Sequence, residues 1–309
     1  MPGRRVIVTG GAGFIGSHVV DAFVALGDEV VALDNLSTGK REYVNAEARL
    51  SELDIVDERS LSASFSEFPA QIVCHLAAQA SVTASVERPE FDLDVNVRGT
   101  LNVCDAARSV GAAVVFASTG GALYGNGAPL PTPEMFIPAP LSPYGASKLA
   151  GEGYVATWGR LYGIPNVVLR LGNIYGPRQN PHGEAGVVAI FSERLLRGEK
   201  VTVYGHGEPT RDYVHVADVA RAFVVAAERK RPGTYNVGTG RETSVRDLLG
   251  LLSEAAGATV EVDLQPLRPG ELERSSLDPS LIEQELGWRA EVPLEQGLRE
   301  TFAAYAAAV

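Results

Sequence analysis

The chain has 309 residues, 45% of them hydrophobic and 21% charged, so it can bury a large core as a globular protein. Its net charge of −11 argues against nucleic acid and anionic membrane surfaces as general partners. The sequence shows no signal peptide and no uninterrupted apolar run long enough to span a membrane, and its cysteines and histidines lack metal-ligand spacing. These features predict a protein of the reducing cytoplasm without a metal site.

The first elements of the chain have the pattern of a dinucleotide-binding unit. A short apolar strand over residues 6–8 runs into a turn that contains Gly10 and Gly13, and apolar residues then recur at helical spacing up to Gly27. Glycines in this context permit a tight turn and let the backbone approach a pyrophosphate, which rests on the helix N-terminus. The alternative is a glycine-rich turn with a purely structural role.

The second strand, residues 30–33, ends in Asp34. An acid about 20 residues beyond the glycines suits a hydrogen bond to an adenosine ribose hydroxyl. The same carboxylate would repel a 2′-phosphate. The sequence therefore favours NAD over NADP.

Strands and helices continue to alternate up to residue 170. Strands are expected over residues 72–76, 114–117 and 166–170, with helical periodicity over residues 91–110. This order predicts a doubly wound parallel sheet with helices on both faces, a Rossmann fold. Ligands bind such sheets at the carboxyl ends of the strands, where Thr119 offers a hydroxyl; a plain turn hydroxyl is the alternative.

Tyr144 and Lys148 are spaced to lie one helical turn apart on the same face. Ser142 suits the N-cap and Pro143 the first position of a helix that runs to about Tyr162. A phenol with a pKa of about 10 is a poor base at neutral pH. A nearby ammonium favours the phenolate, so the pair predicts a base, Tyr144, whose pKa Lys148 lowers. A chance pair on an ordinary helix is the competing interpretation.

The alternation weakens after residue 170, which predicts a second, smaller α/β lobe. We expect an NAD-binding domain over residues 1–170 and a second lobe over 171–309, with an approximate boundary and interleaved segments. Helices are expected over residues 187–196, 217–228 and 244–256, strands over 201–204 and near Tyr235, and two short helices at the end of the chain.

Taken together, these motifs resemble the extended short-chain dehydrogenases/reductases. Residues 171–179, 211–215 and 268–271 narrow the resemblance to the UDP-glucose 4-epimerase (UDP-galactose 4-epimerase) family, over nearly the whole chain from Arg4 to about Leu298. The family implies that NAD accepts a hydride from C4 of a UDP-hexose while Tyr144 takes the 4-hydroxyl proton. The resulting 4-keto sugar then turns over and is reduced on its other face. Thr119 would bind the 4-oxygen and Lys148 the nicotinamide ribose, and residues 171–309 would form the lobe that binds the nucleotide sugar.

The resemblance also implies the remaining site residues and a homodimer. The positions that match NAD contacts are Gly10, Gly13, Phe14, Ile15, Asp34, Asn35, Ser37, Gly39, Asp54, Ile55, Leu76, Ala77, Ala78, Gln79, Asn96, Tyr144 and Lys148. The positions that match substrate contacts are Ser118, Thr119, Tyr144, Asn173, Val187, Tyr204, Arg211, Arg268, Glu271 and Ser275. Among the latter, Asn173, Arg211 and Arg268 would take the diphosphate, although a surface salt bridge is the alternative for each arginine. The dimer would pack through residues 91–110 and 144–162.

Two positions bear on affinity and specificity. Ala80 stands where some family members carry a lysine near the cofactor, which leaves open how tightly NAD is held. Ser275 stands at a position whose bulk gates N-acetylated sugars, so its small side chain predicts that UDP-GlcNAc and UDP-GalNAc are accepted too.

Related activities remain open at this point. A 4,6-dehydratase is disfavoured because no residue from Gly120 to Leu123 can transfer a proton, and a UDP-glucuronate decarboxylase because residues 118–125 contain no acid. A UDP-glucuronate 4-epimerase stays possible, with Arg178 or another base meeting the sugar carboxylate. A non-catalytic dinucleotide sensor is the alternative from a different class, against which Tyr144, Lys148 and Thr119 speak.

Overall fold

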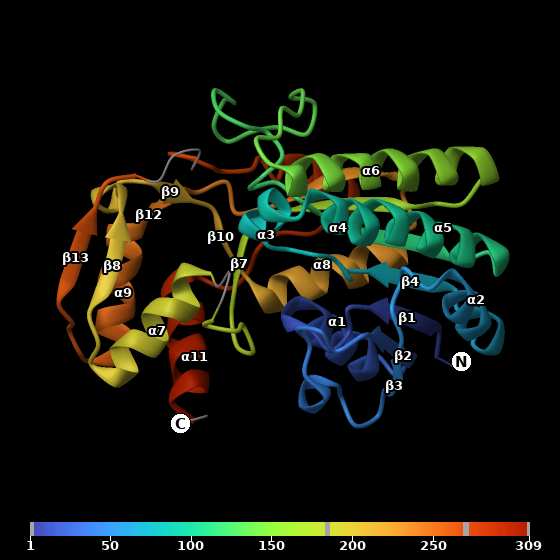
Figure 1. Ribbon diagram of the computed structural model, residues 1–309, viewed down its shortest axis with the longest axis horizontal. Helices are drawn as coiled ribbons and strands as arrows, with labels where there is room; N and C mark the ends of the chain where they lie inside the picture. Colours follow the sequence, from blue (N-terminus) through green and yellow to red (C-terminus); the bar gives the residue numbers. More distant parts are fainter. Residues whose placement is uncertain (1–2, 183–185, 268–271, 308–309) are drawn as a thin grey trace.

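The computed structural model describes residues 3–182, 186–267 and 272–307, and a seven-stranded sheet lies at its centre (Figure 1). The strand order is β11-β6-β5-β4-β1-β2-β3, and every neighbouring pair is parallel. The strands are β1 (Arg5–Thr9), β2 (Glu29–Asp34), β3 (Arg49–Glu52), β4 (Ile72–His75), β5 (Ala113–Thr119), β6 (Val167–Leu171) and β11 (Gly233–Val237). This arrangement confirms the predicted doubly wound fold.

Helices cover both faces of this sheet because its strands are apolar on both sides. Along β1, Val6 and Val8 face one core and Ile7 faces the other, as the alternation of side chains on a strand requires. The first core includes side chains of α1 (Phe14–Ala25) and α8 (Val216–Arg229). The second includes side chains of α2 (Glu58–Glu67), α5 (Gly99–Ser109) and α6 (Pro143–Tyr162).

The helix predicted over residues 91–110 is divided into three segments. These are α4 (Pro89–Leu93), a π-helical turn (Asp94–Arg98) and α5, and a short helix α3 (Val82–Glu87) precedes them. A π-helical turn often marks a functional site, and this one carries Asn96, a predicted cofactor contact. None of the helices in the described ranges is long and apolar enough to cross a membrane.

A second lobe lies at one end of the sheet, on the left in Figure 1. Three two-stranded sheets belong to this part of the chain: β7 (Asn173–Tyr175) with β10 (Tyr213–His215), β9 (Thr210–Arg211) with β12 (Thr243–Ser244), and β8 (Val201–Tyr204) with β13 (Val262–Gln265). Its helices are α7 (Val187–Arg197), α9 (Val245–Ala256) and α11 (Leu294–Ala307), whereas α10 (Ser280–Leu286) packs near β11. Tyr175, Phe191 and Leu248 help to form its separate core.

The chain crosses between the two lobes more than once. After entering the second lobe it returns to the central sheet as α8 and β11, and α8 packs against α1. The carboxyl ends of β5, β6 and β11 therefore face segments of the second lobe, and Thr119 lies at this boundary because it ends β5.

Candidate active site

The turn after β1 has the geometry that a dinucleotide cradle requires. Gly10 has a φ of +70°, and a Cβ added there would lie 2.8 Å from the backbone nitrogen of Ala77. A Cβ on Gly16 would lie 1.9 Å from the carbonyl oxygen of Gly10, so the helix begins in direct contact with the turn. Gly13 is the N-cap of α1 and offers no side chain to the first helical N–H groups. Phe14 and Ile15 thus present amides to an anion, which fits a pyrophosphate.

Asp34 is held rigidly at the end of β2. One carboxylate oxygen accepts from the backbone N–H of Ala12 at 3.0 Å and the other from that of Leu36 at 2.8 Å. A Cβ on Gly39 would lie 2.9 Å from the second oxygen, so the loop that follows packs closely on the carboxylate. Asp34 has further lone pairs with which to accept ribose hydroxyls.

The loop after Asp34 meets the loop after β3. Asn35 donates to Asp54 at 2.9 Å and accepts from the backbone and the hydroxyl of Ser37 at 3.0 and 2.7 Å. Ile55 is buried, and a Cβ on Gly99 would lie 2.6 Å from its side chain. Four of the predicted adenosine-side residues therefore form one connected wall.

Asn96 connects the loop after β4 with α6. Its carbonyl oxygen accepts from the backbone of Gln79 at 2.9 Å, and its amide donates to the carbonyl of Gln79 at 2.9 Å and to Ser147 at 3.2 Å. This loop, residues 76–79, thus runs between β1 and α6. Asn96 holds the loop in place, which is compatible with its predicted role as a cofactor contact.

His75 is a buried, hydrogen-bonded residue of β4. Its Nδ1 lies 2.7 Å from the hydroxyl of Thr9, and its Nε2 lies 3.0 Å from that of Thr100. Burial lowers the pKa of His75 to about 3, so the ring is neutral at physiological pH. Elsewhere in the described ranges no group of three or more His, Cys, Asp or Glu side chains could hold a metal ion.

Tyr144, Thr119 and Lys148 meet at the carboxyl end of β5. Ser142 caps α6 by accepting from the N–H of Gly145 at 3.2 Å, which places Tyr144 in the first turn as predicted. The Tyr144 hydroxyl lies close to that of Thr119, and the ammonium of Lys148 donates to the carbonyl of Ala117 at 3.0 Å. A hydroxyl pair at a strand end can transfer a proton to or from a ligand oxygen.

The pKa of Tyr144 is raised in this geometry, whereas the sequence predicted that Lys148 would lower it. Burial and the carboxylate of Asp92 raise the pKa of Tyr144 to about 12, against a smaller lowering by the Thr119 hydrogen bond. The lysine ammonium instead bonds Ala117 and lies 4.9 Å from the centre of the Phe116 ring. Burial lowers the pKa of Lys148 itself to about 8.

Ser118, a predicted substrate contact, directs its hydroxyl to another side chain of the protein. Its hydroxyl is buried and donates to Glu152 at 2.5 Å, and Glu152 forms a two-pronged pair with Arg170 at 2.9 and 2.7 Å. Sequence reasoning missed Glu152 and Arg170. No local pattern pairs them, because Ser118, Glu152 and Arg170 lie on three different elements, β5, α6 and β6.

The other predicted substrate residues lie on several different elements. Asn173 begins β7, and its side-chain oxygen would lie 3.4 Å from a Cβ on Gly121, close to Thr119. Tyr204 ends β8 and Val187 begins α7, both in the second lobe. Arg211 donates to the carbonyl of Thr210 at 2.8 Å. Arg268 and Glu271 lie outside the described residues.

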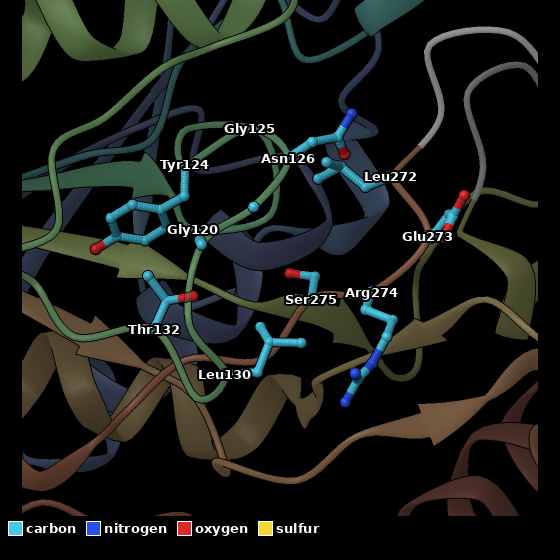
Figure 2. Close-up of a pocket in the computed structure, with 12 residues that line it drawn as sticks. Gly120, Tyr124, Gly125, Asn126, Leu130, Thr132, Leu272, Glu273, Arg274 and Ser275 are labelled. Carbon is cyan, nitrogen blue, oxygen red and sulfur yellow. The ribbon is translucent and has the colours of Figure 1, made fainter.

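A pocket of about 430 Å³ opens at Gly120, the residue that follows Thr119. Figure 2 shows it between the loop after β5 and the segment that bears Ser275, with the Ser275 hydroxyl directed towards the Gly120 side. Tyr124 and Thr132 also line the pocket. A pocket of this size and mixed polarity suits a substituted sugar.

Comparison with known proteins gives matches over most of the chain. The sequence model of the NAD dependent epimerase/dehydratase family matches residues 6–238. A UDP-glucose 4-epimerase from Mycolicibacterium smegmatis is 45% identical over 96% of this chain and 97% of its own length.

Solved structures agree with the sequence matches. A crystal structure of UDP-glucose 4-epimerase with UDP-glucose from Thermotoga maritima has a TM-score of 0.95 at 46% identity, covering 98% of this chain and 99% of that one. A UDP-glucose 4-epimerase from Thermus thermophilus in complex with NAD has a TM-score of 0.92 at 48% identity, covering 99% and 100%.

Proposed function

Because this chain belongs to the NAD dependent epimerase/dehydratase family, we propose that it is an NAD-dependent epimerase that inverts C4 of a UDP-hexose through a transient 4-keto sugar. UDP-glucose and UDP-galactose are the substrate pair. The hydroxyls of Tyr144 and Thr119, which lie close together at the end of β5, carry this proposal.

These two hydroxyls suit the proton transfer. Thr119 ends β5 and its oxygen also accepts from the N–H of Ala122 at 3.2 Å, which fixes its orientation. The sugar 4-hydroxyl would lie against Thr119 and Tyr144, with Tyr144 as the acceptor of its proton. Lys148, held on Ala117, would bind the nicotinamide ribose and supply positive charge beside the reaction.

NAD, when bound, supplies a hydride acceptor for the C4 hydrogen and a donor for the opposite face. The glycine turn, Phe14 and Ile15 would hold its pyrophosphate, and Asp34 its adenosine ribose. The loops that carry Asn35, Asp54 and Ile55 would border the adenosine, and residues 76–79 together with Asn96 the nicotinamide side.

The second lobe would hold the nucleotide part of the substrate. In this assignment residues 1–170, joined by α8 and β11, bind NAD, and the rest of 171–309 binds UDP. Asn173 and Arg211 would contact the diphosphate, and Tyr204 and Val187 would enclose uracil. Arg268 and Glu271 complete this assignment as sequence-based proposals.

Product analysis tests the function directly. Purified protein incubated with UDP-glucose should give UDP-galactose, and UDP-GlcNAc and UDP-glucuronate are assayed in parallel. Conversion of UDP-glucuronate alone would replace the proposal with the glucuronate epimerase alternative. The structure gives that alternative no support, since Arg178 pairs with Asp21 of α1 at 2.7 Å.

Tyr144→Phe removes the proposed base and little else. Epimerisation should fall by at least about 10²-fold, the usual scale of acid–base catalysis, while UDP binding measured by calorimetry persists. Turnover close to that of the wild type would reject Tyr144 as the base.

Acceptance of N-acetylated sugars is a further part of the proposal. Ser275 is small, lines the pocket and is held by its N–H on the carbonyl of Thr210 at 3.2 Å. Ser275→Tyr should fill the pocket and lower activity on UDP-GlcNAc more than on UDP-glucose. An unchanged ratio of the two activities would refute this.

We also propose a cytoplasmic homodimer. Both cysteines, Cys74 and Cys104, are buried free thiols, which suits a reducing compartment. Exposed apolar side chains gather on three neighbouring helices, α3, α4 and α6, and such a surface favours association. These side chains are Val82, Val86, Phe91, Leu93, Tyr154, Leu161 and Tyr162.

A further inference from the structure

A continuous path of hydrogen bonds links the catalytic strand to the far wall of the pocket. It starts at Ser118, beside Thr119, and passes through Glu152 to Arg170. Arg170 then donates to the hydroxyl of Tyr124 at 2.8 Å and to the carbonyl of Glu134 at 3.1 Å. The guanidinium therefore bridges α6 and the loop after β5.

The path continues through Asn236 of β11. The Tyr124 hydroxyl donates to the Asn236 side-chain oxygen at 3.1 Å, and the Asn236 amide donates to the carbonyl of Thr132 at 2.9 Å. The N–H of Thr132 donates to the carbonyl of Ser276 at 2.9 Å, and the N–H of Asp278 donates to the carbonyl of Thr132 at 2.9 Å. The segment bearing Ser275 is thus fastened to the catalytic strand through buried groups.

Tyr124 is the point where this path touches the pocket. Its ring lines the wall, and Figure 2 shows its hydroxyl directed away from Ser275. The side chain is 4% exposed, and the guanidinium of Arg170 lies 5.2 Å from the centre of its ring. The ring forms part of the pocket wall, and the hydrogen bonds of the hydroxyl fix the position of the ring.

We infer that Tyr124 and Arg170 are positioning residues that keep this pocket formed for the C2 substituent of the sugar. The inference rests on the proposed function and goes beyond Ser275, which acts by its own size. A preformed wall spares a ligand the cost of ordering it. A sugar whose N-acetyl group fills the pocket needs that wall, whereas the 2-hydroxyl of glucose leaves most of the pocket empty.

Tyr124→Phe tests the inference because it keeps the ring and deletes only the hydroxyl. We expect kcat/KM for UDP-GlcNAc to fall about fivefold more than for UDP-glucose, the scale of one lost buried hydrogen bond. A general destabilisation of the fold would lower kcat/KM equally for both substrates. Binding affinities of the two nucleotide sugars, measured by calorimetry, give the same ratio if turnover is too slow.

The matched control is Tyr235→Phe. Tyr235 is also buried, and its hydroxyl donates to Glu285 at 2.7 Å, outside the path described. This variant should leave the ratio of the two substrates as in the wild type. An unchanged ratio in Tyr124→Phe, an equal change in both variants, or a wild type that rejects UDP-GlcNAc would overturn the inference. Absence of all UDP-hexose conversion by the wild type would instead refute the proposed function.

Discussion

At the scale of single residues, a buried carboxylate shapes the charge of the catalytic centre. Asp92 of α4 is 1% exposed and accepts from the amides of Gln79 at 2.9 Å and Asn96 at 3.0 Å. Its negative charge raises the pKa of Lys148 against the effect of burial, together with Glu152 of α6. It also raises the pKa of Tyr144. Asp92 thus keeps the lysine charged and makes the phenol a weaker acid.

Asp92→Asn should therefore move the activity profile towards acid. Removing the charge lowers the pKa of Lys148 below its value of about 8 and lowers that of Tyr144 below about 12. Tyr144 then loses its proton at lower pH, and Lys148 loses its charge at lower pH, so both limbs of the kcat/KM profile shift in the same direction. Glu152 and His75 also face Lys148 and are unchanged in the variant.

The control is Asp218→Asn, which neutralises another buried carboxylate, one that pairs with Arg221 at 2.5 Å. The variant should lose stability, because Asp218 also accepts from the N–H groups of Glu291 and Val292, but its pH profile should keep the wild-type limbs. A profile that does not move in Asp92→Asn would show that this carboxylate does not act on the catalytic pair.

Sequence patterns could reveal Tyr144, Lys148 and Thr119 but not their electrostatic partners. The spacing of Tyr144 and Lys148 is local, and so is the cap at Ser142. Glu152, by contrast, gains its role from Ser118 and Arg170, and Tyr124 from Asn236, all brought in from other elements. The pKa of Tyr144 was expected to fall for the same reason: helical spacing shows that Lys148 is near, but not that Ala117 binds its ammonium.

At the scale of elements, α6 and β5 approach closely through a glycine. A Cβ on Gly151 would lie 2.8 Å from the ring of Phe116, which is fully packed and lies below the Lys148 ammonium. The close packing of α6 on β5 thus fixes the distance between Lys148 and the sheet. The sequence predicted both elements, but not which helical residue makes the contact.

Gly151→Ala should destabilise the protein and impair catalysis. The added methyl group forces Phe116 or the helix to shift, at a cost of about 1–3 kcal/mol. Gly153→Ala is the matched control, because nothing lies within 4 Å of its added Cβ. That variant should gain about 0.5–1 kcal/mol from helix propensity. Urea unfolding and kcat check both, and a Gly151→Ala variant as stable and active as Gly153→Ala would contradict the packing argument.

The helix expected over residues 91–110 shows where periodicity stops being informative. Apolar spacing continues through the π-helical turn, so one unbroken helix was predicted. The wider turn directs the Asn96 side chain to Gln79 and Ser147, which lie on different elements. A local pattern of apolar residues does not encode such a tertiary requirement.

At the scale of the whole molecule, the parallel sheet follows from the alternation in the sequence, whereas the return of the chain does not. The expected sheet, its helical layers and a second lobe after residue 170 are present. In the structure α8 packs on α1, and β11 lies beside β6. Both arrangements depend on contacts between segments that are distant in the sequence. The consequence is functional, because β11 brings Asn236 to the pocket wall.

The exposed apolar surface of α3, α4 and α6 gives the last prediction. Leu93 on α4 is 52% exposed and Leu161 on α6 is 64% exposed. If these helices pack against a second copy, a Leu93→Glu/Leu161→Glu variant must bury unpaired carboxylates, which costs several kcal/mol. Light scattering after gel filtration should then give twice the 32.7 kDa chain mass for the wild type and the single mass for the variant. Leu264→Glu, at a 50% exposed leucine of β13 in the second lobe, should remain dimeric. A monomeric wild type, or dissociation of both variants alike, would reject this interface.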